Sequence, residues 1–342
     1  MIVKFKENRV RRAYIGGARI DRFLGKESPQ DGRYPEQWLA SAVEAFNPDM
    51  PKEGEGISLT AEGESFRVLL EKKGKELLGK RCFEKDGGKT SMLVKLLDSK
   101  ERLVIQCHPT AAFARERMGS PFGKAECWYI LDAEADACVY LGFKEGVTRE
   151  RWKSLFLAQD IEGMLSCLHK FPVKAGDLWF VAGGVPHAIG GGSFMIELQE
   201  PSDLMVIPER ITPSGIVLAE QKLHGGLGFE GMLDVYSYGG LSEEQTRKRY
   251  FRHPESVQNR LVPIVDSSLT DQFSMGRLRV LGEASVSLLD SYAVAIVTEG
   301  EGELFCEGER ITLKRGDDFF VGANSGAIKM QGDMELILCV SH

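Results

Sequence analysis

Hydrophobic residues along the chain are grouped into short runs that end at glycine, aspartate, proline or serine. Six such runs recur between residues 91 and 199: SMLVKLLD, RLVIQCHP, CWYILDA, DACVYLGF, DLWFVAGG and SFMIELQ. Runs of this length with turn residues at both ends predict β-strands, and their regular recurrence is typical of a sandwich or barrel. We therefore expect a mainly β fold.

Three segments interrupt this strand pattern. Residues 64–80 carry leucine and phenylalanine at helical spacing, and residues 148–169 do the same after Thr148, a predicted N-cap. Over residues 211–262 the strand pattern fades into a mixed, mainly helical segment. We expect two inserted helical segments and a loose domain boundary near residue 262.

A short internal repeat indicates two related β units. KAGDLWFVAGG begins at Lys174 and KRGDDFFVGAN begins at Lys314, and Lys, Gly, Asp, Phe and Val coincide in register. A match this short also arises by chance. If the two units are homologous, His187 in the first is replaced by Ala327 in the second, so only the first unit keeps a side chain that can bind a metal.

Composition and charge exclude several classes of protein function. The 342 residues are enough for two domains with a large core, and the net charge of −7 leaves no basic footprint for nucleic acid. The seven cysteines form no CxxC pair, which favours a reducing compartment over a disulfide framework. No long apolar run predicts a membrane span or a secretory signal. We expect a soluble, cytoplasmic protein without a nucleic-acid or membrane partner.

Four residues in the strand-like runs are candidate metal ligands. Gln106 and His108 are two positions apart, so their side chains leave the same face of an extended segment. Glu126 opens the next run, and His187 follows a glycine-rich turn. Two imidazoles, a carboxylate and an amide oxygen suit one divalent ion such as zinc, iron or manganese. Spacing alone leaves open that each is an ordinary core or surface side chain.

Motifs along residues 14–203 resemble those of the type I phosphomannose isomerases of the cupin superfamily. Four of them occur in the family's order: QCHP (106–109), GKAECWY (123–129), PHAIGGG (186–192) and IELQEPSD (196–203). Three N-terminal segments are similar as well: YIGG (14–17), PEQWLAS (35–41) and MLVKLLD (92–98).

The resemblance implies a double cupin, or β-jelly-roll, fold with inserted helical segments. Residues 1–210 would form a metal-binding cupin domain, residues 211–262 a connecting segment, and residues 263–342 a second, degenerate cupin domain without metal. In the family, a zinc ion is held by residues that correspond here to Gln106, His108, Glu126 and His187. We expect one zinc ion, or another divalent first-row metal, per chain.

The family's reaction interconverts mannose 6-phosphate and fructose 6-phosphate. This aldose–ketose isomerisation moves a proton between C2 and C1 through an enediol, so it needs a base, a group that polarises the carbonyl and an anchor for the phosphate. Glu197 matches the family's glutamate and is our first choice for the base, with a solvated rim carboxylate as the alternative. Lys95 and Lys124 match family lysines and are candidates to polarise a substrate oxygen or to contact the phosphate. The alternative for Lys124, in a glycine-rich loop, is a simply exposed side chain. Asp203 matches the aspartate of a Ser-Asp pair, and its alternative is a turn cap.

One position departs from the family pattern. Ile207 stands where the family commonly has an arginine after its Ser-Asp pair, and Arg210 is a candidate to replace it. The departure keeps two alternatives open: a non-catalytic sugar-binding or regulatory metal cupin, and an isomerase of an unphosphorylated aldose. With the isomerase as the first choice, the expected partner is a small-molecule sugar phosphate, and the expected assembly is a monomer or homodimer.

Overall fold

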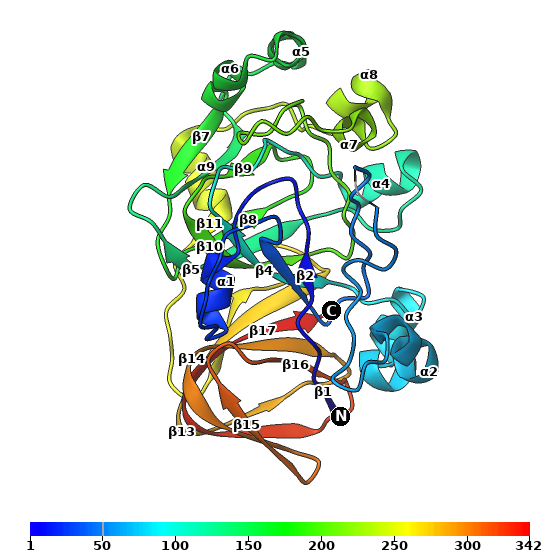
Figure 1. Ribbon diagram of the computed structural model, residues 1–342, viewed down its shortest axis with the longest axis vertical. Helices are drawn as coiled ribbons and strands as arrows, with labels where there is room; N and C mark the ends of the chain where they lie inside the picture. The colour runs from blue at the N-terminus through cyan, green and yellow to red at the C-terminus, as the bar shows by residue number, and fades with distance from the viewer. Residues whose placement is uncertain (50) are drawn as a thin grey trace.

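The computed structural model describes residues 1–49 and 51–342, and its named strands pair into three antiparallel sheets (Figure 1). The mainly β prediction is confirmed. The strands are β1 (Ile2–Val3), β2 (Arg9–Val10), β3 (Glu36–Leu39), β4 (Leu93–Ser99), β5 (Glu126–Ala133), β6 (Cys138–Phe143), β7 (Leu168–Pro172), β8 (Leu178–Val181), β9 (His187–Ile189), β10 (Ser193–Gln199), β11 (Phe251–Arg252), β12 (Leu261–Val265), β13 (Phe273–Ser287), β14 (Ala293–Cys306), β15 (Glu309–Lys314), β16 (Asp318–Val321) and β17 (Ala327–Ser341).

Short helices connect or flank the sheets. They are α1 (Ala18–Phe23), α2 (Phe66–Leu78), α3 (Lys80–Lys85), α4 (Ala111–Arg117), α5 (Arg149–Ala158), α6 (Ile161–Ser166), α7 (Glu220–His224), α8 (Gly228–Leu233) and α9 (Glu243–Tyr250). The segment at 148–169 contains two helices, because Gln159 adopts a left-handed conformation and Asp160 then caps α6 through the N–H of Gly163. Thr148 caps α5 by accepting a hydrogen bond from the Arg151 N–H.

The first large sheet has the strand order β11-β8-β5-β10-β4-β3-β2, with β10 paired to both β5 and β4. Five of the six predicted strands are present, as β4, β5, β6, β8 and β10. The run RLVIQCHP forms no regular strand. It is bridged singly, by Gln106 to His187 on one side and by Cys107 to Val206 on the other. This places it between two parts of the chain rather than within one sheet.

The second large sheet joins the C-terminal strands in the order β1-β16-β14-β17-β13-β12, with β15 paired to β14. The N-terminal strand β1 therefore pairs with a strand near the opposite end of the sequence, as Figure 1 shows. One apolar core cluster contains residues of both large sheets, among them Trp128 and Val94 from the first and Phe273 and Ile337 from the second. The two sheets thus share a core.

The sequence repeat corresponds to a repeated local structure. At Lys174 and Lys314 the backbone N–H donates to the carboxylate of Asp177 or Asp317, closing a turn before β8 or β16. The next strand begins at His187 in the first copy, as β9, and at Ala327 in the second, as β17. The register read from the sequence is therefore the structural register of the two copies.

Candidate metal centre and active site

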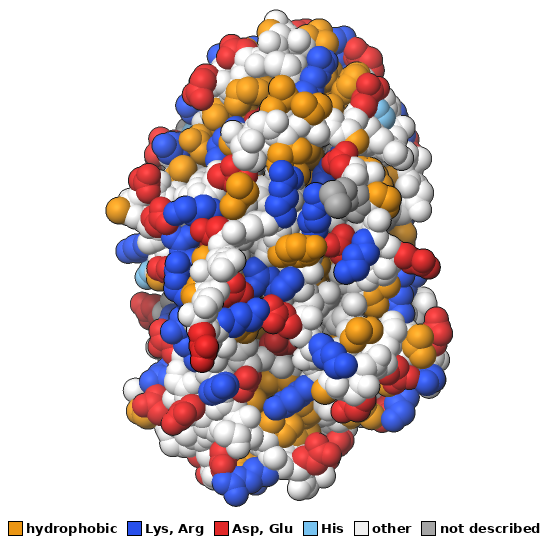
Figure 2. Space-filling view, viewed as in Figure 1, with side chains coloured by type: hydrophobic (Ala, Val, Ile, Leu, Met, Phe, Trp, Pro, Cys, Tyr) orange, Lys and Arg blue, Asp and Glu red, His pale blue; other side chains and the backbone are white. Residues whose placement is uncertain are grey.

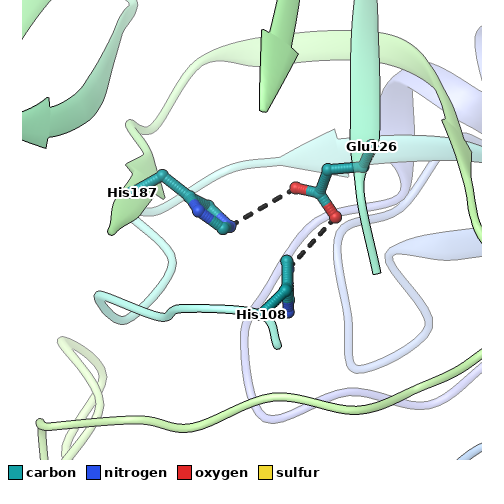
Figure 3. A group of neighbouring side chains, drawn as sticks. All are labelled: His108, Glu126 and His187. Carbon is teal, nitrogen blue, oxygen red and sulfur yellow. Dashed lines mark ion pairs between the residues drawn. The ribbon is translucent and has the colours of Figure 1, made fainter. Parts of the chain in front are cut away.

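Three buried side chains converge to form a candidate metal centre (Figure 3). Glu126 is the first residue of β5, His187 is the first residue of β9, and His108 lies in the extended run before α4. Nε2 of His108 lies 3.1 Å from Oε2 of Glu126, and Nε2 of His187 lies 3.3 Å from Oε1. The ligand atoms all lie within 4.8 Å of one another, close enough to bind one ion.

The backbone fixes how both imidazoles are oriented. Nδ1 of His108 donates to the carbonyl of Leu204, and Nδ1 of His187 donates to the carbonyl of Val185, each at 2.9 Å. This arrangement fixes the tautomer and leaves the lone pair of Nε2 directed toward Glu126. Burial lowers the pKa of His187 to about 3, and burial followed by the charge of Lys124 lowers the pKa of His108. Both shifts favour the neutral ring, which is the form that binds metal.

The cluster fits a divalent cation. Nε2 of His187 is buried and has no hydrogen-bond partner, an arrangement that is costly for a polar atom unless something else satisfies it. Burial would raise the pKa of Glu126, but Lys124 and the two histidines hold it well below its ordinary value. One carboxylate and two neutral imidazoles are ordinary ligands for zinc and similar ions.

Gln106, the fourth predicted ligand, lies directly opposite His187. The two residues exchange both backbone hydrogen bonds, each at 2.9 Å, so their side chains leave the same face of the pair. Gln106 is half-buried and lines the pocket beside the cluster. Its coordination of the ion stays a prediction.

Over residues 1–49 and 51–342, the His108–Glu126–His187 group is the only set of three or more histidine, cysteine or acidic side chains close enough to share an ion. Ala327, which takes the place of His187 in the second copy of the repeat, is exposed.

A pocket lies against this cluster, and Lys124 belongs to both. The Lys124 side chain lines the pocket, and its Nζ lies 2.8 Å from Nε2 of His108 and 3.0 Å from Oε2 of Glu126. A molecule in the pocket would therefore contact a lysine that borders the candidate metal centre.

Glu197 and Lys95 form a buried ion pair in the same pocket. They lie directly opposite each other where β10 pairs with β4, and Lys95 Nζ is 2.8 Å from Oε1 of Glu197. Burial raises the pKa of Glu197 against the opposing charge of Lys95. A carboxyl group whose pKa is raised toward neutrality suits proton transfer, because it can both accept and release a proton.

Asp203 is held by Arg12, which lies outside the motifs that resemble those of the family. Its two oxygens accept from the guanidinium of Arg12 at 3.0 and 3.1 Å, and Arg12 also donates to Glu36 at 3.0 Å. Arg12 and Glu36 line the pocket. The sequence signal that could have placed these two residues at the site is their position. Arg12 precedes the YIGG motif, and Glu36 lies inside PEQWLAS.

The structure does not bring Arg210 into the pocket. Arg210 is exposed, its backbone N–H donates to Gln159, and its guanidinium packs on the rings of Phe156 and Phe229 at 5.5 and 5.7 Å. Ile207 does line the pocket and is 2% exposed. No arginine therefore occupies the position at which the family pattern places one.

Comparisons with known proteins agree with the motifs. Residues 267–341 match the family model "Mannose-6-phosphate isomerase, cupin domain". Mannose-6-phosphate isomerase of Streptococcus mutans is 26% identical, covering 99% of this chain and 98% of the relative. Mannose-6-phosphate isomerase ManA of Bacillus subtilis is 28% identical, covering 75% of this chain and 76% of the relative.

Solved structures show the same fold. The mannose 6-phosphate isomerase from Bacillus subtilis aligns with a TM-score of 0.73 at 23% identity, over 99% of both chains. A mannose 6-phosphate isomerase bound with zinc and yttrium aligns with a TM-score of 0.76 at 16% identity, also over 99% of both chains. In the part of the chain that the structure describes, no helix is long and apolar enough to span a membrane. The predicted cupin fold is confirmed, and over most of its length the chain is similar to mannose-6-phosphate isomerases.

Proposed function

We propose that this protein interconverts mannose 6-phosphate and fructose 6-phosphate through an enediol. The enzyme class is that of relatives aligned over most of the chain. The observation that carries the proposal is a buried carboxylate, Glu197, in a pocket bordered by the candidate metal centre through Lys124. The sugar would lie between them.

The proposed metal site consists of His108, Glu126 and His187, with Gln106 as the fourth ligand. The buried Nε2 of His187, which has no hydrogen-bond partner, supports it. We propose one zinc ion per chain, and another divalent first-row metal would suit the same nitrogen and oxygen donors. Such an ion, when bound, polarises or orients sugar oxygens without changing redox state.

Glu197 is the proposed base. Acting on open-chain mannose 6-phosphate, it accepts the proton from C2, while the C2–H electron pair forms the C1=C2 bond and the carbonyl electron pair moves to O1, which takes a proton from water. Glu197 then returns its proton to C1 as the O2 hydroxyl gives its proton to water and becomes the ketone, which yields fructose 6-phosphate with atoms and charge balanced. Lys95 keeps Glu197 ionised before the transfer, because the two form a 2.8 Å ion pair. Lys124 presents a positive charge where an oxygen of the enediol becomes negative.

Arg12, Glu36 and Asp203 are proposed to position the pocket wall. Each carboxylate is engaged by the Arg12 guanidinium, and Glu36 also accepts hydrogen bonds from Tyr14 and Trp38. Carboxylates with this many hydrogen-bond partners are poor proton acceptors, but they hold the pocket wall rigidly in place.

The proposal includes a cellular setting and an assembly. All seven cysteines are free and buried, as expected in a reducing compartment, and this supports a cytoplasmic location. A small-molecule sugar phosphate is the proposed partner, and a monomer or homodimer is the proposed assembly.

A coupled assay with zinc-loaded protein tests the function. We expect fructose 6-phosphate to form from mannose 6-phosphate, with kcat/KM at least roughly 10–100-fold above that for free mannose, since charged hydrogen bonds to the phosphate are lost in the latter. Turnover of free mannose alone would instead support an isomerase of unphosphorylated aldoses. Binding of either sugar without turnover would support the non-catalytic cupin, the alternative that Ile207 keeps open.

A further inference from the structure

The pocket holds one positive side chain that lacks a partner. Four of its five lysine and arginine side chains lie beside a carboxylate: Arg12 with Asp203 at 3.0 Å, Lys95 with Glu197 at 2.8 Å, Arg102 with Glu209 at 2.6 Å, and Lys124 with Glu126 at 3.0 Å. The fifth is Lys222. Across the described ranges 1–49 and 51–342, its Nζ forms no hydrogen bond or ion pair.

Lys222 is too deeply placed to be an ordinary surface lysine. The residue is 6% exposed and lines the same pocket as Glu197 and Lys124. Burial lowers its pKa, and the neighbouring charge of Arg12 lowers it further. Three carboxylates oppose this effect: Asp203 and Glu36, which Arg12 already binds, and Asp49. A buried ammonium group without a hydrogen-bond partner is costly, and an anion bound in the pocket would supply one.

The helix α7 holds Lys222 next to the position where the family pattern has an arginine. The Ile207 N–H donates to the carbonyl of Leu223 at 2.8 Å, and the Ile207 side chain packs with Leu218 and Leu223. The segment that carries Ile207 is thus fastened to the residue adjoining Lys222. Lys222 therefore carries its charge on a segment fastened to the one that lacks the arginine.

We propose that Lys222 binds the phosphate group of the substrate and takes over the charge of the arginine that Ile207 replaces. This inference rests on the proposed function and adds the anchor for the phosphate. An ammonium group acts as a point charge with three donors, so it can meet a phosphate without the paired geometry that a guanidinium requires. In the four paired cations, the neighbouring carboxylate offsets the positive charge and so weakens the attraction for a phosphate.

Kinetics of Lys222→Met test the assignment, with Lys75→Met as the matched control. Lys75 is an exposed lysine on α2 without an ion-pair partner in the described structure. Lys222→Met should raise KM for mannose 6-phosphate roughly 10–100-fold, the loss expected for one charged hydrogen-bond partner, and change kcat much less. Lys222→Arg should recover much of the lost affinity. An unaltered KM in Lys222→Met would overturn the proposal.

Thermal melting separates a binding role from a structural one and does not depend on turnover. Methionine keeps the apolar stem of Lys222 and removes its charge, so without ligand Lys222→Met should melt at the same or a higher temperature. Inorganic phosphate should raise the melting temperature of the wild type and of Lys75→Met, but much less that of Lys222→Met. An equal rise in all three proteins would contradict a phosphate site at Lys222. If phosphate stabilises the wild type and Lys222→Met differs as expected, but mannose 6-phosphate is not turned over, the proposed function is contradicted and the anion site at Lys222 is supported.

Discussion

Single side chains of the candidate metal centre owe their orientation to backbone carbonyls. Leu204 and Val185 accept the Nδ1 protons of His108 and His187, which leaves both Nε2 atoms directed toward Glu126. A histidine held in this way cannot easily turn to another partner. Replacing one should therefore remove a ligand rather than rearrange the set.

The first prediction is that His187→Ala loses the ion. Wild-type protein should contain about one divalent ion per chain by elemental analysis, and His187→Ala should bind it at least roughly 100-fold more weakly, beyond the effect typical of losing a group that merely orients a ligand. His253→Ala is the control, because His253 is exposed and pairs with Asp177. Undiminished metal in His187→Ala, or an equal loss in the control, would argue against this centre.

The sequence predicted the metal-centre side chains better than the pocket wall. His108, Glu126 and His187 lie in short motifs whose order could be compared with a family, and the structure brings them together. Arg12 contacts Asp203 across 191 positions, and such a pairing leaves no local pattern. Lys222 was missed for the same reason, since only folding shows that it is buried.

At the scale of elements, the repeated turn before β8 and β16 requires glycine in both copies. Gly176 has φ +86° and Gly316 has φ +92°, a region that side-chain-bearing residues rarely adopt. The surroundings differ. A Cβ at Gly316 would lie 2.8 Å from the backbone oxygen of Phe23, whereas a Cβ at Gly176 would lie 3.5 Å from the nearest atom, in the ring of His253.

The second prediction compares these two glycines. Gly176→Ala should cost about 1–2 kcal/mol of unfolding free energy from its left-handed backbone alone. Gly316→Ala should cost more, by about 1 kcal/mol or above, because its Cβ also presses on backbone that cannot turn aside. Urea unfolding of both variants measures the difference. A smaller cost at Gly316 than at Gly176 would show that the contact with Phe23 relaxes.

Periodicity correctly predicted the strands whose backbone hydrogen bonds all lie within one sheet. The five confirmed strands pair over several residues, whereas RLVIQCHP, which has the same apolar pattern, is bridged to different segments at successive residues. Periodicity records which side chains are buried, but not where the backbone hydrogen bonds go. Helical spacing over 148–169 likewise did not reveal the break at Gln159, whose left-handed φ of 52° separates α5 from α6.

At the scale of the whole molecule, the two large sheets are joined by both core and chain. The shared apolar cluster contains residues of both, and β1 pairs with β16, with Ile2 opposite Val321 and Val3 opposite Phe320. On the face drawn in Figure 2, lysine and arginine side chains are interspersed with aspartate and glutamate rather than gathered into one basic patch.

The third prediction is that the two sheets unfold together. Because neither can separate without exposing the shared core, calorimetry should show one transition, with agreement between the calorimetric and van't Hoff enthalpies. Removing residues 1–4 should lower the temperature of that single transition, since β16 then loses its pairing with β1. Two resolved transitions in the intact chain would contradict a common core.

The role of Glu197 as the base is tested most directly by the turnover of mannose 6-phosphate by Glu197→Gln. The metal content is determined on the same sample. Gln keeps the size of the side chain but cannot accept the proton, so kcat should fall roughly 10²–10⁴-fold, the usual contribution of a general base. Metal content should stay at the wild-type level, and KM should change little. Glu283→Gln, an exposed carboxylate on β13, should retain wild-type turnover. Nearly unaltered turnover in metal-loaded Glu197→Gln would contradict the assignment of Glu197 as the base.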